Sequence, residues 1–67
     1  MRVVAMFDPP LAMQQLREWR DQNQELLARI PEEAIRIDVG RTVDGDFARV
    51  KIEEAYAAGF GPPAQGA

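Results

Sequence analysis

The dipeptide Asp-Gly at positions 44–45 is the feature that most constrains what this chain can fold into. Flanked by alternating apolar and charged residues, it is typical of a β-hairpin, because Asp and Gly tolerate the positive φ angles of a type I′ turn. With this pair at the centre of the turn, Val39 faces Val50 and Ile37 faces Ile52. The sequence therefore predicts a hairpin with one apolar and one charged face.

The charged face of this hairpin carries two pairs of opposite charges. Asp38 faces Lys51 and Arg36 faces Glu53, and such cross-strand pairs favour this register over its neighbours. Phe47 stands on the same face. An exposed aromatic ring there indicates either a cover for a nearby glycine or an anchor for a partner, and the sequence leaves both possibilities open.

The segments before the hairpin predict one strand and one helix. Residues 2–7 are short, β-branched and apolar, which is typical of a strand. Asp8 is placed to cap a helix that has a proline at its first position and runs without Gly or Pro over residues 11–29. Pro31 then ends it.

Together these elements predict a small α+β domain of order β-α-β-β, with one helix packed on one face of a three-stranded sheet. The domain covers residues 1–58, and residues 59–67 form a flexible Gly/Pro/Ala tail. Two points stay open: the first strand can join either hairpin strand, and residues 53–60 can extend the second hairpin strand or form a helical turn.

A second copy of the chain is an expected partner. At 67 residues, with no cysteine for disulfides and no histidine or cysteine for zinc, a single core has little stability to spare. The helix carries a stripe at heptad spacing, in which an Asn occupies a position that often fixes register and oligomer state. The predicted homodimer interface therefore consists of Leu16, Trp19, Asn23, Leu26 and Ile30.

Charge and hydropathy exclude some other partners. The net charge is −3, with eleven acidic against eight basic residues, which argues against direct nucleic-acid binding. The apolar run before Asp8 is too short for a signal peptide or a membrane span. We expect a soluble, cytoplasmic protein that does not bind membranes.

Catalysis is not expected, because the chain has no His, Cys or Ser and so lacks the commonest general base and nucleophiles. No cofactor or metal is expected either. The acidic residues of the hairpin tip and of its open end lack the spacing of a calcium loop and are read as a solvated rim. The segment GFGPPA fits a dinucleotide fingerprint only formally, since no strand and helix flank it.

These exclusions favour a non-catalytic protein-binding module. Its partner surface is predicted at the hairpin tip and charged face, because function concentrates on loops held by rigid scaffolds. Proteins of this size and composition suit an accessory or inhibitory role in a phage or mobile element. The alternatives are a small subunit or activator of a larger enzyme complex and a structural component of a larger particle. The predicted contact residues are Asp44, Asp46, Phe47 and Arg49.

Overall fold

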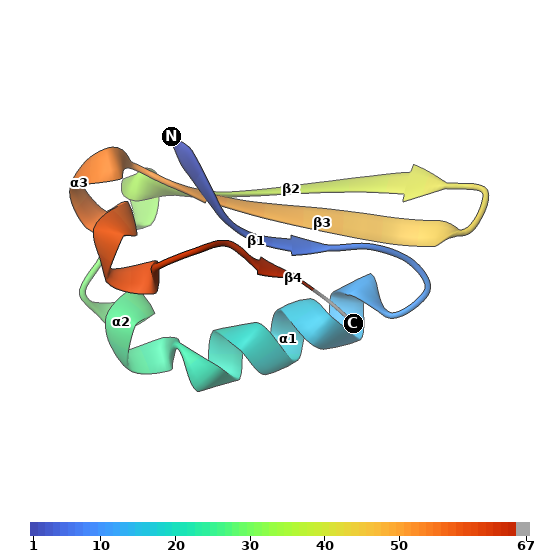
Figure 1. The fold of residues 1–67 in the computed structure, drawn as a ribbon, viewed down its shortest axis with the longest axis horizontal. Helices are drawn as coiled ribbons and strands as arrows, with labels where there is room; N and C mark the ends of the chain where they lie inside the picture. The colour runs from blue at the N-terminus through green and yellow to red at the C-terminus, as the bar shows by residue number, and fades with distance from the viewer. Residues whose placement is uncertain (66–67) are drawn as a thin grey trace.

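The computed structural model describes residues 1–65 and packs a layer of helices against one face of a mixed sheet (Figure 1). This confirms the prediction of a small α+β domain. The strands are β1 (Arg2–Phe7), β2 (Ile35–Thr42), β3 (Gly45–Ile52) and β4 (Ala64–Gln65), and the helices are α1 (Ala12–Gln22), α2 (Gln24–Ala28) and α3 (Glu54–Ala57), with 3-10 turns at Glu32–Ala34 and Ala58–Phe60.

The sheet has the strand order β2-β3-β1-β4 among the described residues. β1 pairs antiparallel with β3, so the first strand joins the third and not the second. β4 pairs parallel with β1, which places Ala64 opposite Ala5. The predicted three-stranded sheet with a single helix was therefore incomplete, because the chain after residue 58 returns along β1 and adds a short fourth strand.

The segment after the hairpin is helical, which decides the question left open over residues 53–60. α3 passes into the 3-10 turn, and Gly61, at φ 65°, follows it. Phe60 and Ala64, both from the predicted flexible tail, pack against the core. Residues 66–67 of that predicted tail lie outside the described part of the chain.

The hairpin turn lies one residue earlier than the sequence indicates. Val43 and Asp44 are the turn residues, and Gly45, at φ 126°, begins β3. The Thr42 hydroxyl stabilises this turn, because it accepts the Asp44 N–H at 3.1 Å and donates to the Gly45 carbonyl at 3.0 Å. A side-chain bond of this kind competes with the turn that the Asp-Gly pair alone would favour.

The strand register is offset by two residues as a consequence. Ile37 faces Val50 instead of Ile52, and Phe47 faces Gly40 directly. The predicted pairing was wrong, but the predicted faces were right. An offset of two residues keeps every side chain on its face, because successive side chains of a strand alternate between the two sides.

The long helix predicted over residues 11–29 is divided at Asn23. The backbone N–H and the side-chain Nδ2 of Asn23 both donate to the carbonyl oxygen of Trp19, at 3.0 and 2.8 Å. With φ −111° and ψ 16°, Asn23 leaves the helical conformation, ends α1 and begins α2. Asn does this readily, since its amide competes with the helical backbone bonds.

The N-cap predicted at Asp8 was also wrong. α1 begins at Ala12, and Leu11 occupies the cap position without a side-chain hydrogen bond. The carboxylate of Asp8 instead lies 3.0 Å from the guanidinium of Arg49 on β3. An opposite charge within reach therefore holds Asp8 at the end of β1, and the helix starts after the following turn.

The core lies between α1 and the central strands β1 and β3. The Trp19 ring contacts the ring of Phe7, with 6.5 Å between centroids, and stacks on the ring of Phe60 at 5.7 Å and 28°. The core thus joins a strand, the helix and the C-terminal segment. The buried side chains are Val4, Ala5, Phe7, Ala12, Leu16, Trp19, Ala34, Ala48, Val50, Ile52 and Ala57.

Candidate functional site

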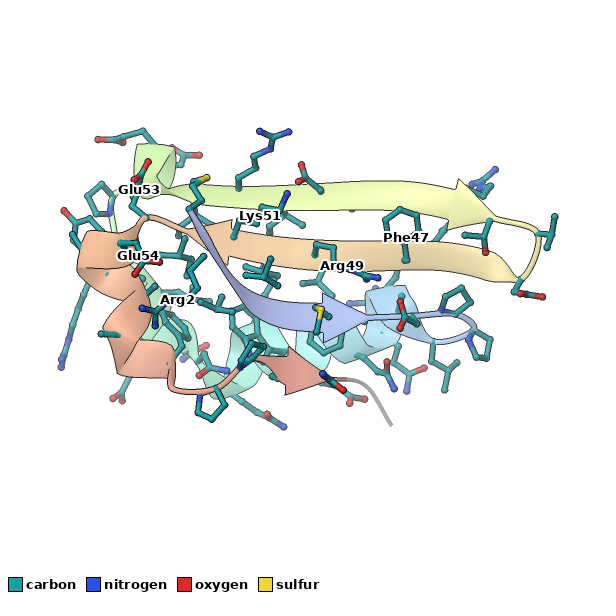
Figure 2. All side chains as sticks on the ribbon, turned by 45° about the horizontal axis from the view of Figure 1, so that its top comes forward. Arg2, Phe47, Arg49, Lys51, Glu53 and Glu54 are labelled. Atoms are coloured by element: carbon teal, nitrogen blue, oxygen red, sulfur yellow. The ribbon has the colours of Figure 1, made fainter. Side chains whose placement is uncertain are left out.

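The face of the sheet opposite the helices carries part of the predicted partner surface. Phe47, Arg49 and Lys51 follow one another along β3 and point to this side (Figure 2). Asp46 does not join them: it pairs with Arg41, and strand alternation turns both to the helix side of the sheet. The structure therefore brings together only the aromatic and basic half of the predicted site.

Phe47 is engaged within the chain. A Cβ atom added to Gly40 would lie 2.3 Å from the tip of the Phe47 ring, so the ring occupies the space above this glycine. The guanidinium carbon of Arg49 lies 5.1 Å from the ring centroid, within the range of a cation–π contact. The sequence left open whether Phe47 covers a glycine or anchors a partner. The contacts of its ring support the first role.

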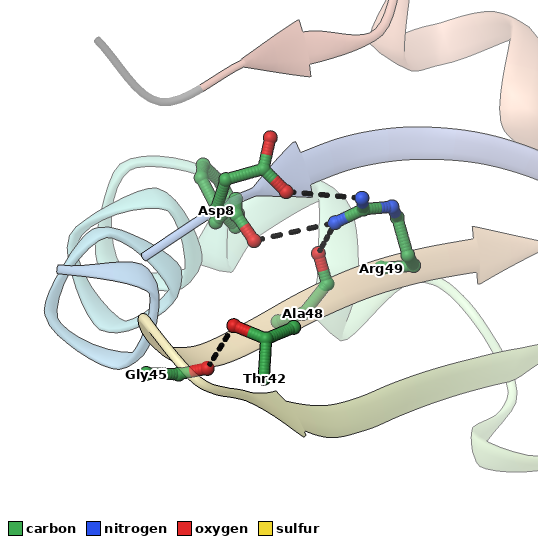
Figure 3. A network of polar contacts seen from close by, with 6 residues as sticks. Asp8, Thr42, Gly45, Ala48 and Arg49 are labelled. Carbon is green, nitrogen blue, oxygen red and sulfur yellow. Dashed lines mark hydrogen bonds and ion pairs between the residues drawn. The ribbon is translucent and has the colours of Figure 1, made fainter. Parts of the chain in front are cut away.

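Arg49 also binds the end of β1. Its guanidinium donates to the carbonyl oxygens of Phe7 at 3.3 Å and Ala48 at 3.0 Å and to the carboxylate of Asp8 at 3.0 Å (Figure 3). This network ties β3 to the loop before α1. Arg49 therefore has a structural role in the chain itself.

Three further charged side chains of this face, Arg36, Asp38 and Lys51, are paired with one another. Asp38 accepts a hydrogen bond from the Lys51 ammonium at 3.0 Å and another from Arg36 at 2.7 Å. These two hydrogen bonds lower the pKa of Asp38 below its usual value of 3.8, and the bond from Lys51 has the larger effect. The Asp38–Lys51 pair was predicted, although the offset register makes it diagonal. Arg36 reaches Asp38 instead of Glu53.

The acidic residues at the two ends of the hairpin have different surroundings. Glu54 makes a two-pronged contact with Arg2, at 2.7 and 3.2 Å, and Asp44 is exposed in the turn. A hollow between the turn and the loop after β1 is lined by Asp44, Thr42 and the loop residues 8–10. Within residues 1–65, no group of three acidic side chains is placed to hold a metal ion.

The predicted dimer interface is divided between the core and the surface. Leu16 and Trp19 are only 8% and 7% exposed, because they pack against the chain's own sheet. Asn23 bonds to the Trp19 carbonyl, and α1 ends there. Leu26 and Ile30, beyond this break, are half-buried. These five residues do not form one continuous outer stripe.

The most exposed apolar surface of the sheet lies on β2. Ile37 is 37% exposed and Val39 is 56% exposed, although both point to the same side of the sheet as the buried Val50. Ile35, on the same side, is partly buried. We call these three side chains the β2 flank. Beside them is a hollow of about 360 Å³, lined by Trp19, Arg20, Leu27, Glu32, Ile35, Ile37 and Val50.

The β2 flank is uncovered because the helix layer is too narrow for the whole sheet. A helix is about 10 Å across and strands are about 4.8 Å apart, so one helix covers roughly two strands. α1 packs over β3 and β1 and leaves β2 at the margin. The sequence shows the apolar residues of β2 and one long helical segment, but which strands this segment covers follows only from the strand order.

β2 is also an open edge of the sheet. Within residues 1–65, β4 pairs with the outer side of β1, whereas no strand pairs with the outer side of β2 (Figure 1). Its alternate backbone N–H and C=O groups therefore face outward and can hydrogen-bond to another strand. The exposed backbone edge and the exposed apolar side chains occur on the same eight-residue strand.

Comparisons of the chain with protein-family models, with curated proteins and with solved structures found no match. In the part of the chain that the structure describes, no helix is both long and apolar enough to cross a membrane.

Proposed function

We propose that this chain is a small non-catalytic protein-binding module whose contact surface is the β2 flank together with the open edge of β2. One observation carries the proposal: the chain leaves Ile37 and Val39 in contact with solvent at the edge of a sheet whose neighbouring Val50 is fully buried. Exposed apolar side chains along an open edge are typical of a surface that another chain covers.

The partner that fits this surface is an extended protein segment with apolar side chains at alternate positions. Such a segment can add a strand to β2 through main-chain hydrogen bonds and can place every second side chain against the β2 flank. The hollow beside Ile37 offers additional apolar contact at the helix side. A binding role also agrees with a chain that has no His, Cys or Ser.

The partner surface predicted from the sequence, at the hairpin tip and charged face, is secondary in this proposal. Phe47 and Arg49 already have partners within the chain, so recruiting them would require breaking those contacts. Asp44 and Asp46 lie close to β2 and can contribute to the rim of the interface. An accessory or inhibitory role in a phage or mobile element is also part of the proposal. It rests on the small size of the chain and on its lack of the common catalytic residues.

The β2 flank is tested with two matched substitutions. Val39→Asp places a charge on the β2 flank, whereas Val43→Asp makes the same change at a turn residue that is fully exposed. Each protein is tagged, incubated with a lysate of the source cells and with a differently tagged wild-type copy, and the bound proteins are identified by mass spectrometry. Thermal unfolding shows beforehand that both variants are folded.

A binding surface predicts that a stoichiometric partner, itself or another protein, is retained by the wild type and by Val43→Asp and is lost with Val39→Asp. Equal retention by the two variants would overturn the proposal. Absence of any partner on the wild-type chain, including its own copy, would overturn it as well.

A further inference from the structure

We infer that the segment bound at the β2 flank is β2 of a second copy, paired antiparallel about a two-fold axis at Ile37. This inference rests on the proposed function and names the partner of that same surface. β2 is itself an extended segment with apolar side chains at alternate positions, because Ile35, Ile37 and Val39 all point to one side of the sheet. It therefore has the chemistry that its own flank requires.

Symmetry restricts the possible registers. A two-fold axis perpendicular to the sheet makes the interface isologous, so residue i contacts j and j contacts i. The apolar side chains of both strands must also lie on the same side of the joined sheet. One strand can therefore shift along the other only in steps of two residues. The axis then passes midway between the two copies of one β2 residue, and each choice of that residue can be examined by the charges that it places opposite each other.

The register centred on Ile37 is complementary throughout. Ile37 faces Ile37 of the second copy, and Ile35 faces its Val39. On the opposite side of the sheet, Arg36 faces its Asp38, and symmetry makes this ion pair twice. Opposite charges directly across from each other stabilise a strand pair, and apolar pairs do the same. The network of Lys51, Asp38 and Arg36 within each chain would continue across the axis.

The neighbouring registers are less favourable. Centring on Asp38 places two aspartates opposite each other, and centring on Arg36 does the same with two arginines. Like charges directly opposite destabilise a pair. Centring on Val39 places Ile37 opposite Arg41, an apolar side chain against a charge. Among these four registers, the pairing of charges and of apolar side chains therefore favours the axis at Ile37.

Assembly in this register would give one continuous sheet with the helices of both copies on the same side. The β2 flanks of the two copies would then adjoin at the axis, between the two helix layers. Both observations behind the proposed function, the open backbone edge and the exposed Ile37 and Val39, receive one explanation in this arrangement.

The register is tested by cysteine cross-linking, for which the chain is suited because it contains no cysteine. In the Ile37→Cys protein, the two thiols meet at the axis, with Cα atoms about 5.5 Å apart or less, within disulfide range. In the Val39→Cys protein, the thiols are displaced by four residues, roughly 13 Å along the strands. Val43→Cys reports random collisions, because Val43 is fully exposed in the turn.

Under mild oxidation we expect the Ile37→Cys chain to form a covalent dimer, at least about tenfold faster than the Val39→Cys and Val43→Cys chains. An equimolar mixture of the Ile35→Cys and Val39→Cys proteins should give the heterodimer in preference to either homodimer. Tryptophan emission shows whether the Ile37→Cys protein is folded. If it is not, the mixture of Ile35→Cys and Val39→Cys tests the register in its place.

Sedimentation equilibrium of the wild type should show dimers at ~100 μM, above the micromolar dissociation constants of weak complexes. A monomeric wild type, or cross-linking of Ile37→Cys no faster than of Val43→Cys, would overturn the second copy as occupant. The proposed function would survive this result if Val39→Asp still lost a different protein that Val43→Asp retained. Faster cross-linking of Val39→Cys would overturn the register.

Discussion

The ring of Phe47 fills the space above Gly40, the residue directly opposite it on β2. Glycine leaves a gap in a strand, since it has no side chain to pack, and an aromatic ring from the neighbouring strand can close that gap. The two residues therefore act as one packing unit near the turn of the hairpin. The guanidinium of Arg49 lies over the same ring and completes this unit.

Gly40→Ala should destabilise the protein, because the new methyl group would lie 2.3 Å from the Phe47 ring and force it away. We expect a loss of about 1 kcal/mol in the free energy of unfolding, the lower end of the range for overpacking, because the clash involves the far end of a half-buried ring that can move toward solvent. Urea denaturation monitored by circular dichroism measures it.

The cost should depend on the ring. In a Phe47→Ala background the methyl group meets no clash, so the same Gly40→Ala substitution should cost at least about 0.5 kcal/mol less. Equal costs in the two backgrounds would show that the ring and the glycine are not coupled, and would return Phe47 to the role of an anchor for a partner.

This pair also illustrates what the sequence could and could not predict in the hairpin. Period-two alternation assigned Phe47 and Gly40 to the same face correctly, because that pattern is local. The register was missed, since the Thr42 hydroxyl bonds to the turn and moves it by one residue. A side chain that competes with a turn motif is not visible in the motif itself.

Tertiary contacts account for the other differences. Phe60 stacks on Trp19 across the core, so a segment that reads as a Gly/Pro tail contains packed residues. The β2 flank was missed for a similar reason: the residues were recognised as apolar, but which strands the helix would cover depends on the strand order. Single-sequence patterns do not encode that order.

Asn23→Ala should lower the free energy of unfolding by about 1 kcal/mol, because it removes the side-chain bond to the Trp19 carbonyl. Asn23→Leu should not raise the stability either, because leucine also lacks the amide that bonds to this carbonyl. Gln22→Ala, at an exposed neighbouring amide, is the matched control and should change the stability by less than about 0.5 kcal/mol. Chemical denaturation compares the three. A gain in stability for Asn23→Leu, together with larger oligomers, would favour an interface on the helix instead.

Phe60→Ala should both destabilise the protein and expose its single tryptophan. The ring is half-buried, so we expect a loss of about 2 kcal/mol, below the range for fully buried aromatic residues. Tryptophan emission should shift to longer wavelength, since Trp19 loses its stacked neighbour. Tyr56→Ala, an exposed aromatic residue in α3, is the control. Unchanged emission and stability in Phe60→Ala would mean that the segment is not held against the core in solution.

The stability should fall at low pH through Asp38. Lys51 and Arg36 favour its charged form in the folded chain and lower its pKa below the usual 3.8 of the unfolded chain. A lowered carboxyl pKa contributes stability above the unfolded value, and this contribution is lost as the pH falls through the folded value. The stability difference between the wild type and Asp38→Asn should therefore shrink as the pH is lowered from ~5 to ~2.

Titration of the Asp38 carboxyl carbon by NMR gives the folded pKa directly. Lys51→Gln removes the larger cause and should move this pKa back toward its usual value, whereas an unchanged midpoint would show that Lys51 does not hold Asp38 in solution.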